Sequence, residues 1–334
     1  MFNRVIKGIV TSAVMLASVT SLNVQADDEM KVLNFGIIST ESSQNLKTIW
    51  EPFLDDMEEK LGMEVKPFFA PDYAGIIQGM RFDKVDIAWY GNKSAMEAVD
   101  RAGGEIFAQT VDVSGNPGYW SLLITNKDSK LNDVDDMLEN SKDLTFGNGD
   151  PNSTSGYLVP AYYVFAVNEV DPKTAFKRML NSSHETNLLA VANGQVDVAT
   201  NNTESFARLE VTNPEKAKQI KVIWKSPLIP ADPIVWRKNL PENVKGKVYD
   251  FFMEYGTDGN EEEAKTLADL QWAPFKASSD DQLLPIRQLV LFKQRLAVEQ
   301  DDALSKDEKS QKIASLNAEL AGLERRLAAL DARQ

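Results

Sequence analysis

The stretch LTFGNGDPNSTSGYLVPAYYVF, residues 144–165, decides the fold, because a short strand, a polar turn and a helix-like run follow one another in it. Residues 144–147 have the pattern of a buried strand, and residues 157–167 are predicted to form a helix. Between them NSTSG, residues 152–156, places three hydroxyl side chains directly before the helix. A strand that leads through a turn into a helix is the building unit of α/β folds.

The same unit occurs a second time, displaced by 111 residues toward the N-terminus. Two short matches share this displacement: LNFG at 33–36 with LTFG at 144–147, and VDIA at 85–88 with VDVA at 196–199. In the first copy, a strand at 31–38 precedes a helix whose apolar stripe runs from Leu46 to Leu61 and ends at Gly62. We therefore expect two regions of similar topology, each a parallel sheet flanked by helices.

Two segments are predicted to connect these regions, at residues 113–119 and at the proline-rich residues 226–233. The apolar strand 234–236 and the helix 242–255 would then return the chain to the first region. The sequence thus predicts an α/β protein with two lobes and a hinged cleft between them. The predicted segments are a signal peptide at 1–26, lobe 1 at 27–115 plus 232–300, lobe 2 at 116–231, and a helical tail at 301–334.

The N-terminus has the pattern of a secretory signal peptide. Arg4 and Lys7 precede an apolar run at residues 9–22, and small residues precede a cleavage site after Ala26. We expect a cleaved, periplasmic protein; a membrane anchor is the alternative, although the run is short for a bilayer span. The chain contains no cysteine, which excludes a lipid attached at the cleavage site and a disulfide framework.

Composition also limits the function. A formal net charge of −14 argues against nucleic acid or anionic lipid as the partner. The chain has one histidine, His184, and none of the common hydrolase, metalloprotease or nucleotide-binding motifs, so we expect no metal site and no cofactor. Ser153 with His184 remains as a possible nucleophile and base, but no nucleophile-elbow pattern surrounds the serine. We therefore expect a binding protein and not an enzyme.

The hydroxyl-rich turn before the second-half helix is a candidate anion site. A helix N-terminus offers unpaired backbone N–H groups and the positive end of the helix dipole. Ser153, Thr154 and Ser155 would add neutral hydrogen-bond donors to it. Ordinary capping of the helix by one hydroxyl is the alternative interpretation.

The 111-residue displacement adds two relationships to this turn. It places Tyr73 opposite His184, and Ser42 and Ser43 opposite Ser153 and Thr154. Each half thus carries hydroxyls and a ring donor at corresponding helix starts. His184 is predicted at the start of a helix that runs to Ala192, where it either donates to an anion or lies at the surface.

Two carboxylates are placed near the same edge of the sheets. Glu204 follows the strand 196–199, and Asp232 lies in the second connection. On a cleft floor they would hold an ammonium group at the other end of a ligand; solvent exposure is the alternative for both. Tyr119, in the first connection, would line the cleft floor or pack the connection itself.

The last residues have a heptad pattern. Apolar side chains alternate at spacings of three and four: Ile313, Leu316, Leu320, Leu323, Leu327 and Leu330. Such a helix either docks on its own body or pairs with the same helix of a second subunit, so a homodimer through this tail is possible.

Several longer motifs resemble the periplasmic phosphonate-binding proteins of phosphonate ABC transporters. They are FGIISTES, FFAPDYAGIIQGMRF, VDIAWYGN, PGYW, LTFGNGDPNSTSG, VDVATNNTE and SPLIPADPIVWRKNL, and the resemblance runs from about residue 33 to residue 293. It implies a type II periplasmic-binding-protein fold that closes on a ligand and delivers it to a membrane permease and its ATPase.

The resemblance also implies a ligand site. The phosphonate group would be held by the hydroxyl-rich turn with help from a histidine and a tyrosine, here Ser153, Thr154, Ser155, His184 and Tyr73. An ammonium group, as in 2-aminoethylphosphonate, would meet Glu204 and Asp232 and be enclosed by Tyr73 and Tyr119. Another oxyanion, such as phosphite, a phosphate ester or a sulfonate, is the alternative ligand.

Overall fold

The computed structural model describes residues 30–257 and 259–332, so the predicted signal peptide at 1–26 lies outside the described residues. The strands are β1 Val32–Ile37, β2 Glu64–Phe69, β3 Ile87–Trp89, β4 Gly104–Asp112, β5 Gly118–Tyr119, β6 Ser121–Asn126, β7 Thr145–Asn148, β8 Arg178–Asn181, β9 Val198–Asn202, β10 Ile220–Lys225, β11 Ile229–Pro230, β12 Pro233–Arg237 and β13 Trp272–Ala277. The α-helices are α1 Ser43–Leu61, α2 Tyr73–Arg81, α3 Asn92–Arg101, α4 Val134–Glu139, α5 Pro172–Ala175, α6 His184–Ala192, α7 Thr203–Thr212, α8 Pro214–Ala217, α9 Glu242–Glu254, α10 Glu261–Asp269, α11 Leu284–Gln300 and α12 Lys306–Asp331.

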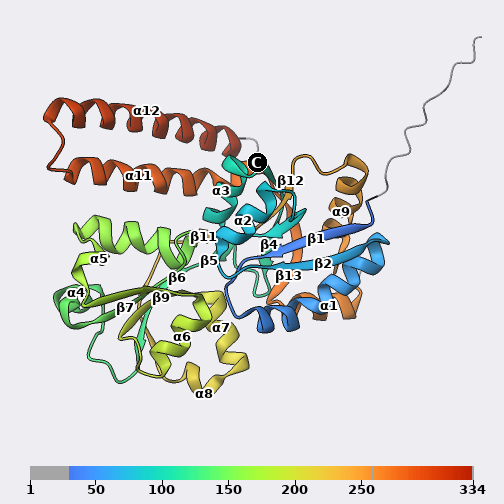
Figure 1. The fold of residues 1–334 in the computed structure, drawn as a ribbon, viewed down its shortest axis with the longest axis horizontal. Coiled ribbons are helices and arrows are strands. Elements are labelled where there is room, and N and C mark those ends of the chain that lie inside the picture. The colour runs from blue at the N-terminus through green and yellow to red at the C-terminus, as the bar shows by residue number, and fades with distance from the viewer. Residues whose placement is uncertain (1–29, 258, 333–334) are drawn as a thin grey trace, which may run out of the picture. The chain divides into compact units, whose positions relative to one another are not determined.

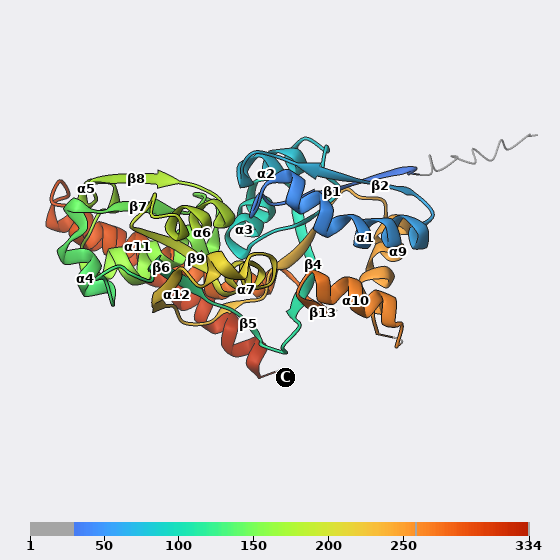
Figure 2. The same cartoon turned by 90° about the horizontal axis from the view of Figure 1, so that it is seen from below.

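Two sheets organise these elements (Figures 1 and 2). A six-stranded sheet has the order β13-β4-β12-β3-β1-β2, and a five-stranded sheet has the order β10-β6-β9-β7-β8. We refer to the six-stranded sheet and the helices packed on it as the first lobe, and to the five-stranded sheet and its helices as the second lobe. Strand β12 returns the chain to the first sheet, as the sequence predicted, and the α/β fold class is confirmed. The exact lobe boundaries at 115, 231 and 300 stay a prediction.

The internal repeat is visible in the strand register. In the first sheet Phe35 pairs with Ile87, and in the second Phe146 pairs with Val198, each partner displaced by the same 111 residues. Helices α2 and α6 begin and end at equivalent positions of the repeat as well. The two halves therefore have the same local wiring.

The aspartate of the repeated Val-Asp-apolar-Ala motif explains why the motif recurs. Asp86 Oδ2 accepts a hydrogen bond from Asn34 N at 2.7 Å, and Asp197 Oδ2 accepts the equivalent bond from Thr145 N, also at 2.7 Å. Each carboxylate thus joins the entry of one parallel strand to the entry of its neighbour. Only Asp86 is buried, and it also pairs with Arg237 Nε at 2.7 Å.

The sheets are mixed and not wholly parallel, which corrects the sequence expectation. Strands β1, β2 and β3 run parallel, as do β7, β8 and β9, whereas β12 and β6 run antiparallel to their neighbours. A strand that arrives through a connection between the lobes enters its sheet from the edge at which the parallel strands end, so it must run in the opposite direction.

The two predicted connections lie side by side. Strand β5 of the first and β11 of the second form a two-stranded antiparallel ribbon, with Tyr119 paired to Ile229 and Gly118 to Pro230. A side chain at Gly118 would lie 2.0 Å from the carbonyl oxygen of Ile229, so glycine is required there. The connections are therefore hydrogen-bonded to one another.

The run after the hydroxyl-rich turn is not the regular α-helix that the sequence predicted. Its backbone forms wide π-helical turns at Thr154–Leu158 and Ala161–Phe165 and a 3₁₀ turn at Ala166–Asn168. Pro160 lies between the π turns, and because proline has no N–H it removes one bond of the regular helical ladder. Leu158 N accordingly bonds to Ser153 O, five residues back, at 3.1 Å.

Separate apolar clusters stabilise the two faces of the second sheet. Strand β6 shows the alternation: Leu122 and Ile124 pack beneath α6, whereas Leu123 packs with Phe146 and Phe165 on the opposite face. In the first lobe, an aromatic cluster centred on Phe53 of α1 joins that helix to α9 and β13. These cores hold rigid the strand ends from which the site is built.

The C-terminal residues form a helical hairpin, in which α12 folds back along α11 (Figure 1). Leu320 of the heptad pattern is buried, but the other five predicted seam residues are only half-buried: Ile313, Leu316, Leu323, Leu327 and Leu330. Arg326 pairs with Asp281 at 2.5 Å and ties α12 to the body of its own chain. The long terminal helix is confirmed, and pairing with a second subunit stays a prediction.

Candidate functional site

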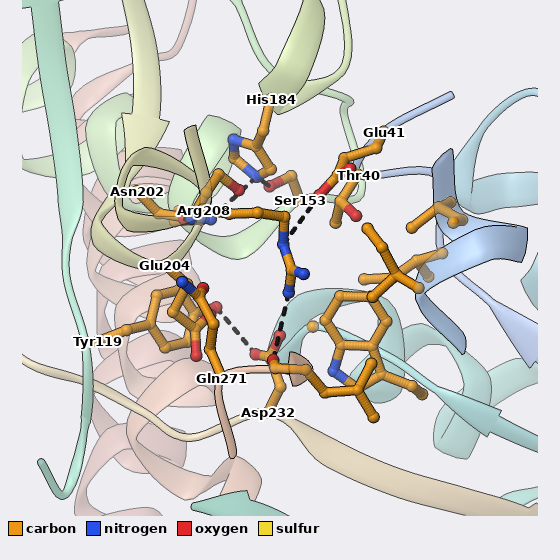
Figure 3. A pocket seen from close by; sticks show the side chains of 18 of the residues that line it. Thr40, Glu41, Tyr119, Ser153, His184, Asn202, Glu204, Arg208, Asp232 and Gln271 are labelled. Atoms are coloured by element: carbon orange, nitrogen blue, oxygen red, sulfur yellow. Dashed lines mark hydrogen bonds and ion pairs between the residues drawn. The ribbon is translucent and has the colours of Figure 1, made fainter. Parts of the chain in front are cut away.

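All the residues that the sequence singled out as ligand-binding line one pocket between elements of the two lobes (Figure 3): Tyr73, Tyr119, Ser153, Thr154, Ser155, His184, Glu204 and Asp232. They come from the starts of α2, α6 and α7, from the π-helical turn after β7, from β5, and from the segment between β11 and β12. Each of these positions follows the carboxyl end of a strand or begins a helix, which is where α/β sheets place ligands.

The hydroxyl-rich turn carries three buried oxygens, and each accepts a hydrogen bond from the protein. Ser153 Oγ accepts from Gly156 N at 2.9 Å, Thr154 Oγ1 from Lys93 N at 2.8 Å, and Ser155 Oγ from the Asn202 side chain at 3.2 Å. A hydroxyl whose oxygen accepts still has its own proton to donate. Ser153 alone caps the helix, so the other two hydroxyls exceed what capping requires.

Two glycines allow the turn to close. Gly149 N donates to Gly156 O at 2.9 Å, and a side chain at Gly149 would lie 2.6 Å from the Gly156 backbone. At Gly156 a side chain would lie 2.9 Å from Ser153 Oγ and 3.1 Å from the His184 ring. The glycines of GNGDPNSTSG therefore let the backbone pack directly against the hydroxyls and the histidine.

His184 is the first residue of α6 and its ring is buried in this pocket. Its Nε2 lies 3.3 Å from the Asn202 amide nitrogen and 3.5 Å from Ser153 Oγ, whereas Nδ1 has no hydrogen-bond partner among the described residues. An Nε2 that accepts from an amide leaves the proton on Nδ1. Burial lowers the pKa of His184 to about 4, so the ring is neutral at pH 7 and the one proton it can offer is that on Nδ1.

Tyr73 occupies the equivalent position at the start of α2. Its backbone N–H donates to Asp150 Oδ2 of the second lobe at 3.1 Å, and its side chain is buried. Burial first, and then the charges of Asp232 and Asp150, raise the pKa of the Tyr73 phenol well above its usual value. The phenol therefore keeps its proton and is a donor.

The carboxylates form the other end of the pocket. Asp232 is buried just after β11, and its Oδ1 accepts from Tyr119 Oη at 2.9 Å and faces the Asn92 amide at 3.5 Å (Figure 3). Glu204 lies in the first turn of α7. Burial first, and then the charge of Glu204, raise the pKa of Asp232 well above its usual value. Burial, and then the charge of Asp112, raise the pKa of Glu204 to about 7.

Burial is the largest cause of both raised carboxyl pKa values, so the charged forms of Glu204 and Asp232 are incompletely compensated by the protein. Burying two acids side by side costs free energy unless a cation accompanies them or protons remain bound. The geometry therefore suits a ligand that brings its own cation.

The two serines that the repeat placed opposite the hydroxyl-rich turn lie outside the pocket, and so does Tyr90. Ser42 caps α1 by accepting from Asn45 N at 3.3 Å and is exposed, as is Ser43. Tyr90 is buried in the first lobe and donates to Ile76 O at 3.0 Å. The two halves therefore share equivalent helices and strands, but the first half has no hydroxyl-rich turn that faces the pocket.

Sequence reasoning missed several lining residues. Arg208 and Glu41 form an ion pair at the pocket, with Nε of Arg208 3.0 Å from Oε1 of Glu41 (Figure 3). The other missed polar residues are Thr40, Asn202, Ser205 and Gln271, and three packed indoles complete the wall: Trp50, Trp89 and Trp272. Of these residues, only Arg208 could have been found from the sequence, because it follows Glu204 by four residues and therefore lies on the same face of a helix.

The lobes contact one another directly around the pocket. Besides the Arg208–Glu41 pair, Glu185 of α6 accepts from Ser42 N at 2.8 Å and from the Asn45 amide at 2.5 Å. Lys93 N of the first lobe donates to Thr154 as described above. These bonds hold the two walls of the pocket together.

The described residues hold no group of three or more His, Cys, Asp or Glu side chains that could bind a metal ion. Within the same part of the chain, none of the helices has the length and hydropathy of a membrane span.

Comparison with known proteins gives a consistent result. A family model described as ABC transporter, phosphonate, periplasmic substrate-binding protein matches residues 35–283. The phosphonates-binding periplasmic protein of Escherichia coli is 64% identical over 307 residues, which cover 92% of this chain and 90% of the relative. A probable ABC transporter phosphite-binding protein of Prochlorococcus marinus is 26% identical over 68% of this chain and 75% of the relative.

Among solved structures, a binding-protein component of an ABC phosphonate transporter from Pseudomonas aeruginosa has 70% sequence identity. The alignment covers 91% of this chain and 100% of that one, with a TM-score of 0.88.

Proposed function

As the chain belongs to the family of periplasmic substrate-binding proteins of phosphonate ABC transporters, we propose that its preferred ligand is 2-aminoethylphosphonate. Family membership gives the coarser function: the protein is a periplasmic phosphonate-binding component of an ABC transporter and not an enzyme. One observation carries the proposal of this ligand: a single pocket joins a cluster of buried neutral donors to two carboxylates, the buried Asp232 and the half-buried Glu204.

The donor cluster fits a phosphonate group. The hydroxyls of Ser153, Thr154 and Ser155 retain protons to donate, and the neutral His184 and Tyr73 are donors beside them. Hydrogen bonds to a charged group contribute about 1.5–3 kcal/mol each, so a few of them suffice for tight binding. These donors are uncharged, and their bonds to an anionic oxygen are stronger than their bonds to a neutral one.

The carboxylates fit an ammonium group. An ammonium beside Glu204 and Asp232 offsets the cost of burying their charges, which a ligand without a cation leaves uncompensated. Tyr119 fixes the orientation of Asp232 through its 2.9 Å hydrogen bond. 2-Aminoethylphosphonate would therefore make favourable contacts at both ends of the pocket, through its phosphonate group and through its ammonium group.

The experiment compares 2-aminoethylphosphonate with ethylphosphonate and phosphate by titration calorimetry. We expect the amine to bind tightest and phosphate weakest. In Asp232→Asn the advantage of the amine over ethylphosphonate should fall on the order of tenfold or more, the ratio that 1.4 kcal/mol produces. Equal affinities in the unsubstituted protein would contradict the role of the carboxylates.

Another oxyanion is the second candidate. A distant relative is a probable phosphite-binding protein, and phosphite would use the donor cluster alone. The same titration with phosphite decides between them: if phosphite binds more tightly than 2-aminoethylphosphonate, the carboxylates do not serve the ligand.

We further propose that the lobes, with boundaries at 115, 231 and 300, close about the β5–β11 ribbon when the ligand binds and that the permease senses the closed form. The predicted export signal would be removed after Ala26, which sequencing the N-terminus of the exported protein would test.

A homodimer through the C-terminal hairpin belongs to this proposal as well, because α11 leaves most of the heptad residues of α12 half-exposed. Light scattering on the mature chain and on a chain ending at Asp301 tests it. A dimer that becomes a monomer supports the pairing, and a monomer in both cases leaves α12 as a helix docked on its own body.

A further inference from the structure

A cationic side chain lines a pocket whose phosphonate end consists of neutral donors. Arg208 lies four residues after Glu204 on the same face of α7, and both line the pocket together with Asp232. The charge of Arg208 lowers the pKa of Glu204, so it acts on the carboxylate end of the site. A guanidinium at this place needs an explanation, because the proposed ligand brings an ammonium to the same end.

Arg208 is fastened to the first lobe by two bonds. Its Nε lies 3.0 Å from Glu41 Oε1, and its Nη2 donates to the carbonyl oxygen of Leu270 at 3.2 Å. The side chains of Arg208 and Glu41 are only 20% and 11% exposed. Figure 3 shows the Nε side of the Arg208 guanidinium facing Glu41, with the outer nitrogens turned toward the part of the pocket where Asp232 lies.

A guanidinium without this partner would change what the pocket recognises. Its planar donors bind phosphate and phosphonate oxygens two at a time, and its charge repels an ammonium. It would therefore favour any oxyanion and oppose the amine. Pairing with Glu41 neutralises the charge and occupies the donors that face the first lobe.

We propose that Glu41 is a specificity-determining residue, which withdraws Arg208 from the ligand so that the pocket accepts an ammonium at one end and an oxyanion only at the other. This inference rests on the proposed function. It assigns a role in ligand choice to a residue that belongs to neither the donor cluster nor the carboxylate pair.

The competing interpretation is that the ion pair only holds the lobes together. A contact of that kind changes the closure equilibrium and weakens every ligand by the same factor. Glu185 offers a matched control, because it is also a glutamate that joins the lobes, through Ser42 N at 2.8 Å and Asn45 at 2.5 Å, but does not line the ligand pocket.

The experiment measures the Kd of 2-aminoethylphosphonate, ethylphosphonate and phosphate for the mature protein and three variants. Glu41→Gln should reduce the preference for the amine over ethylphosphonate on the order of tenfold, the change that 1.4 kcal/mol produces, and should strengthen phosphate relative to the amine. Glu185→Gln should weaken all three ligands equally. The double variant Glu41→Gln with Arg208→Met should regain the amine preference, because the free guanidinium is gone.

If Glu41→Gln weakens all three ligands by the same factor, the ion pair only holds the lobes together and the inference is wrong. An unchanged preference for the amine over ethylphosphonate would also contradict it. A double variant that does not regain the preference would show that Arg208 does not mediate the effect. Circular dichroism and thermal unfolding of each variant establish that it is folded. If the unsubstituted protein itself shows no preference for the amine, the proposed function fails first, and the two failures are thereby distinguished.

Discussion

Tyr119 Oη donates to Oδ1 of Asp232 across 2.9 Å, and this bond joins the two connections between the lobes at the floor of the ligand pocket. Replacing Tyr119 with Phe removes the donor but keeps the ring. Asp232 then loses a bond that favours its charged form, so the pKa of Asp232 should rise further. We expect 2-aminoethylphosphonate to bind about 1–3 kcal/mol more weakly, the range for a lost bond to a buried charge. Calorimetry with ethylphosphonate as control should show a much smaller loss of affinity. Equal losses of affinity for both ligands would mean that the substitution acts through the β5–β11 ribbon and not through the carboxylate.

Binding of the amine should depend on pH. The pKa of Glu204 is raised to about 7, chiefly by burial, so below that pH the carboxyl keeps a proton that an ammonium must displace. Affinity for 2-aminoethylphosphonate relative to ethylphosphonate should therefore fall as the pH decreases through 7, by at most about tenfold per pH unit for one proton. The ammonium lowers the second pKa of its own phosphonate group, so each affinity is first corrected for the dianion fraction of that ligand at the given pH. A ratio that is constant with pH would mean that the carboxyl pair does not exchange protons with the ligand.

The same carboxyl predicts the pH dependence of stability without ligand. A folded-state pKa above the usual value of 4.5 stabilises the protein while the group is protonated, and this contribution is lost as the pH rises from 4.5 through about 7. In Glu204→Gln the decline of the melting temperature over this range should be shallower. Asp232 contributes in the same direction.

The three hydroxyls of the anion turn should differ in their effects. Ser153→Ala removes a helix cap as well as a donor, so it should lower the free energy of unfolding by about 1 kcal/mol and also weaken binding. Ser155→Ala removes no cap and should weaken phosphonate binding by about 1.5–3 kcal/mol with little change in the melting temperature. If Ser155→Ala leaves the affinity unchanged, the surplus hydroxyls are structural.

The repeated aspartates should contribute unequally to stability. Asp86 is buried and paired with Arg237 at 2.7 Å, whereas Asp197 makes the equivalent backbone bond at an exposed position. Asp86→Ala removes a buried carboxylate that accepts from Asn34 N, from the Asn34 amide and from Arg237 Nε, and should cost about 3 kcal/mol of unfolding free energy. Asp197→Ala, the matched control, should cost about 1 kcal/mol. Urea unfolding of both variants measures the difference, and equal losses would show that the backbone bond alone matters.

The fold could be predicted from sequence wherever one residue imposes a local geometry. The repeated Asp bonds the entries of two strands, so the VDIA and VDVA motifs located β3 and β9. The π-helical turns could not be predicted, because a run of apolar residues has the same periodicity whether its hydrogen bonds span four residues or five. The direction of β6 and β12 could not be predicted either, because it depends on the edge of the sheet at which each connection between the lobes enters.

The site shows a similar division. The hydroxyl turn, His184 and the carboxylates lie at helix starts and strand ends, where position along the chain implies position in the cleft. Glu41 and Arg208 come from opposite lobes, and no local pattern relates residues 41 and 208. Their contact exists only in the assembled tertiary structure, and sequence spacing gives no measure of it.

The shared register of the two halves has a consequence for the evolution of selectivity. Two identical copies facing one another across a cleft would present identical ends and would suit only a ligand with the same charge at both ends. A zwitterion requires a polar asymmetry between the copies. The two equivalent helix starts do not provide it, because Tyr73 and His184 both belong to the donor cluster. The asymmetry comes from residues around them: the hydroxyl turn of the second half at one end of the pocket, and Glu204 and Asp232 at the other. A shared backbone with different side chains thus gives the pocket two unlike ends.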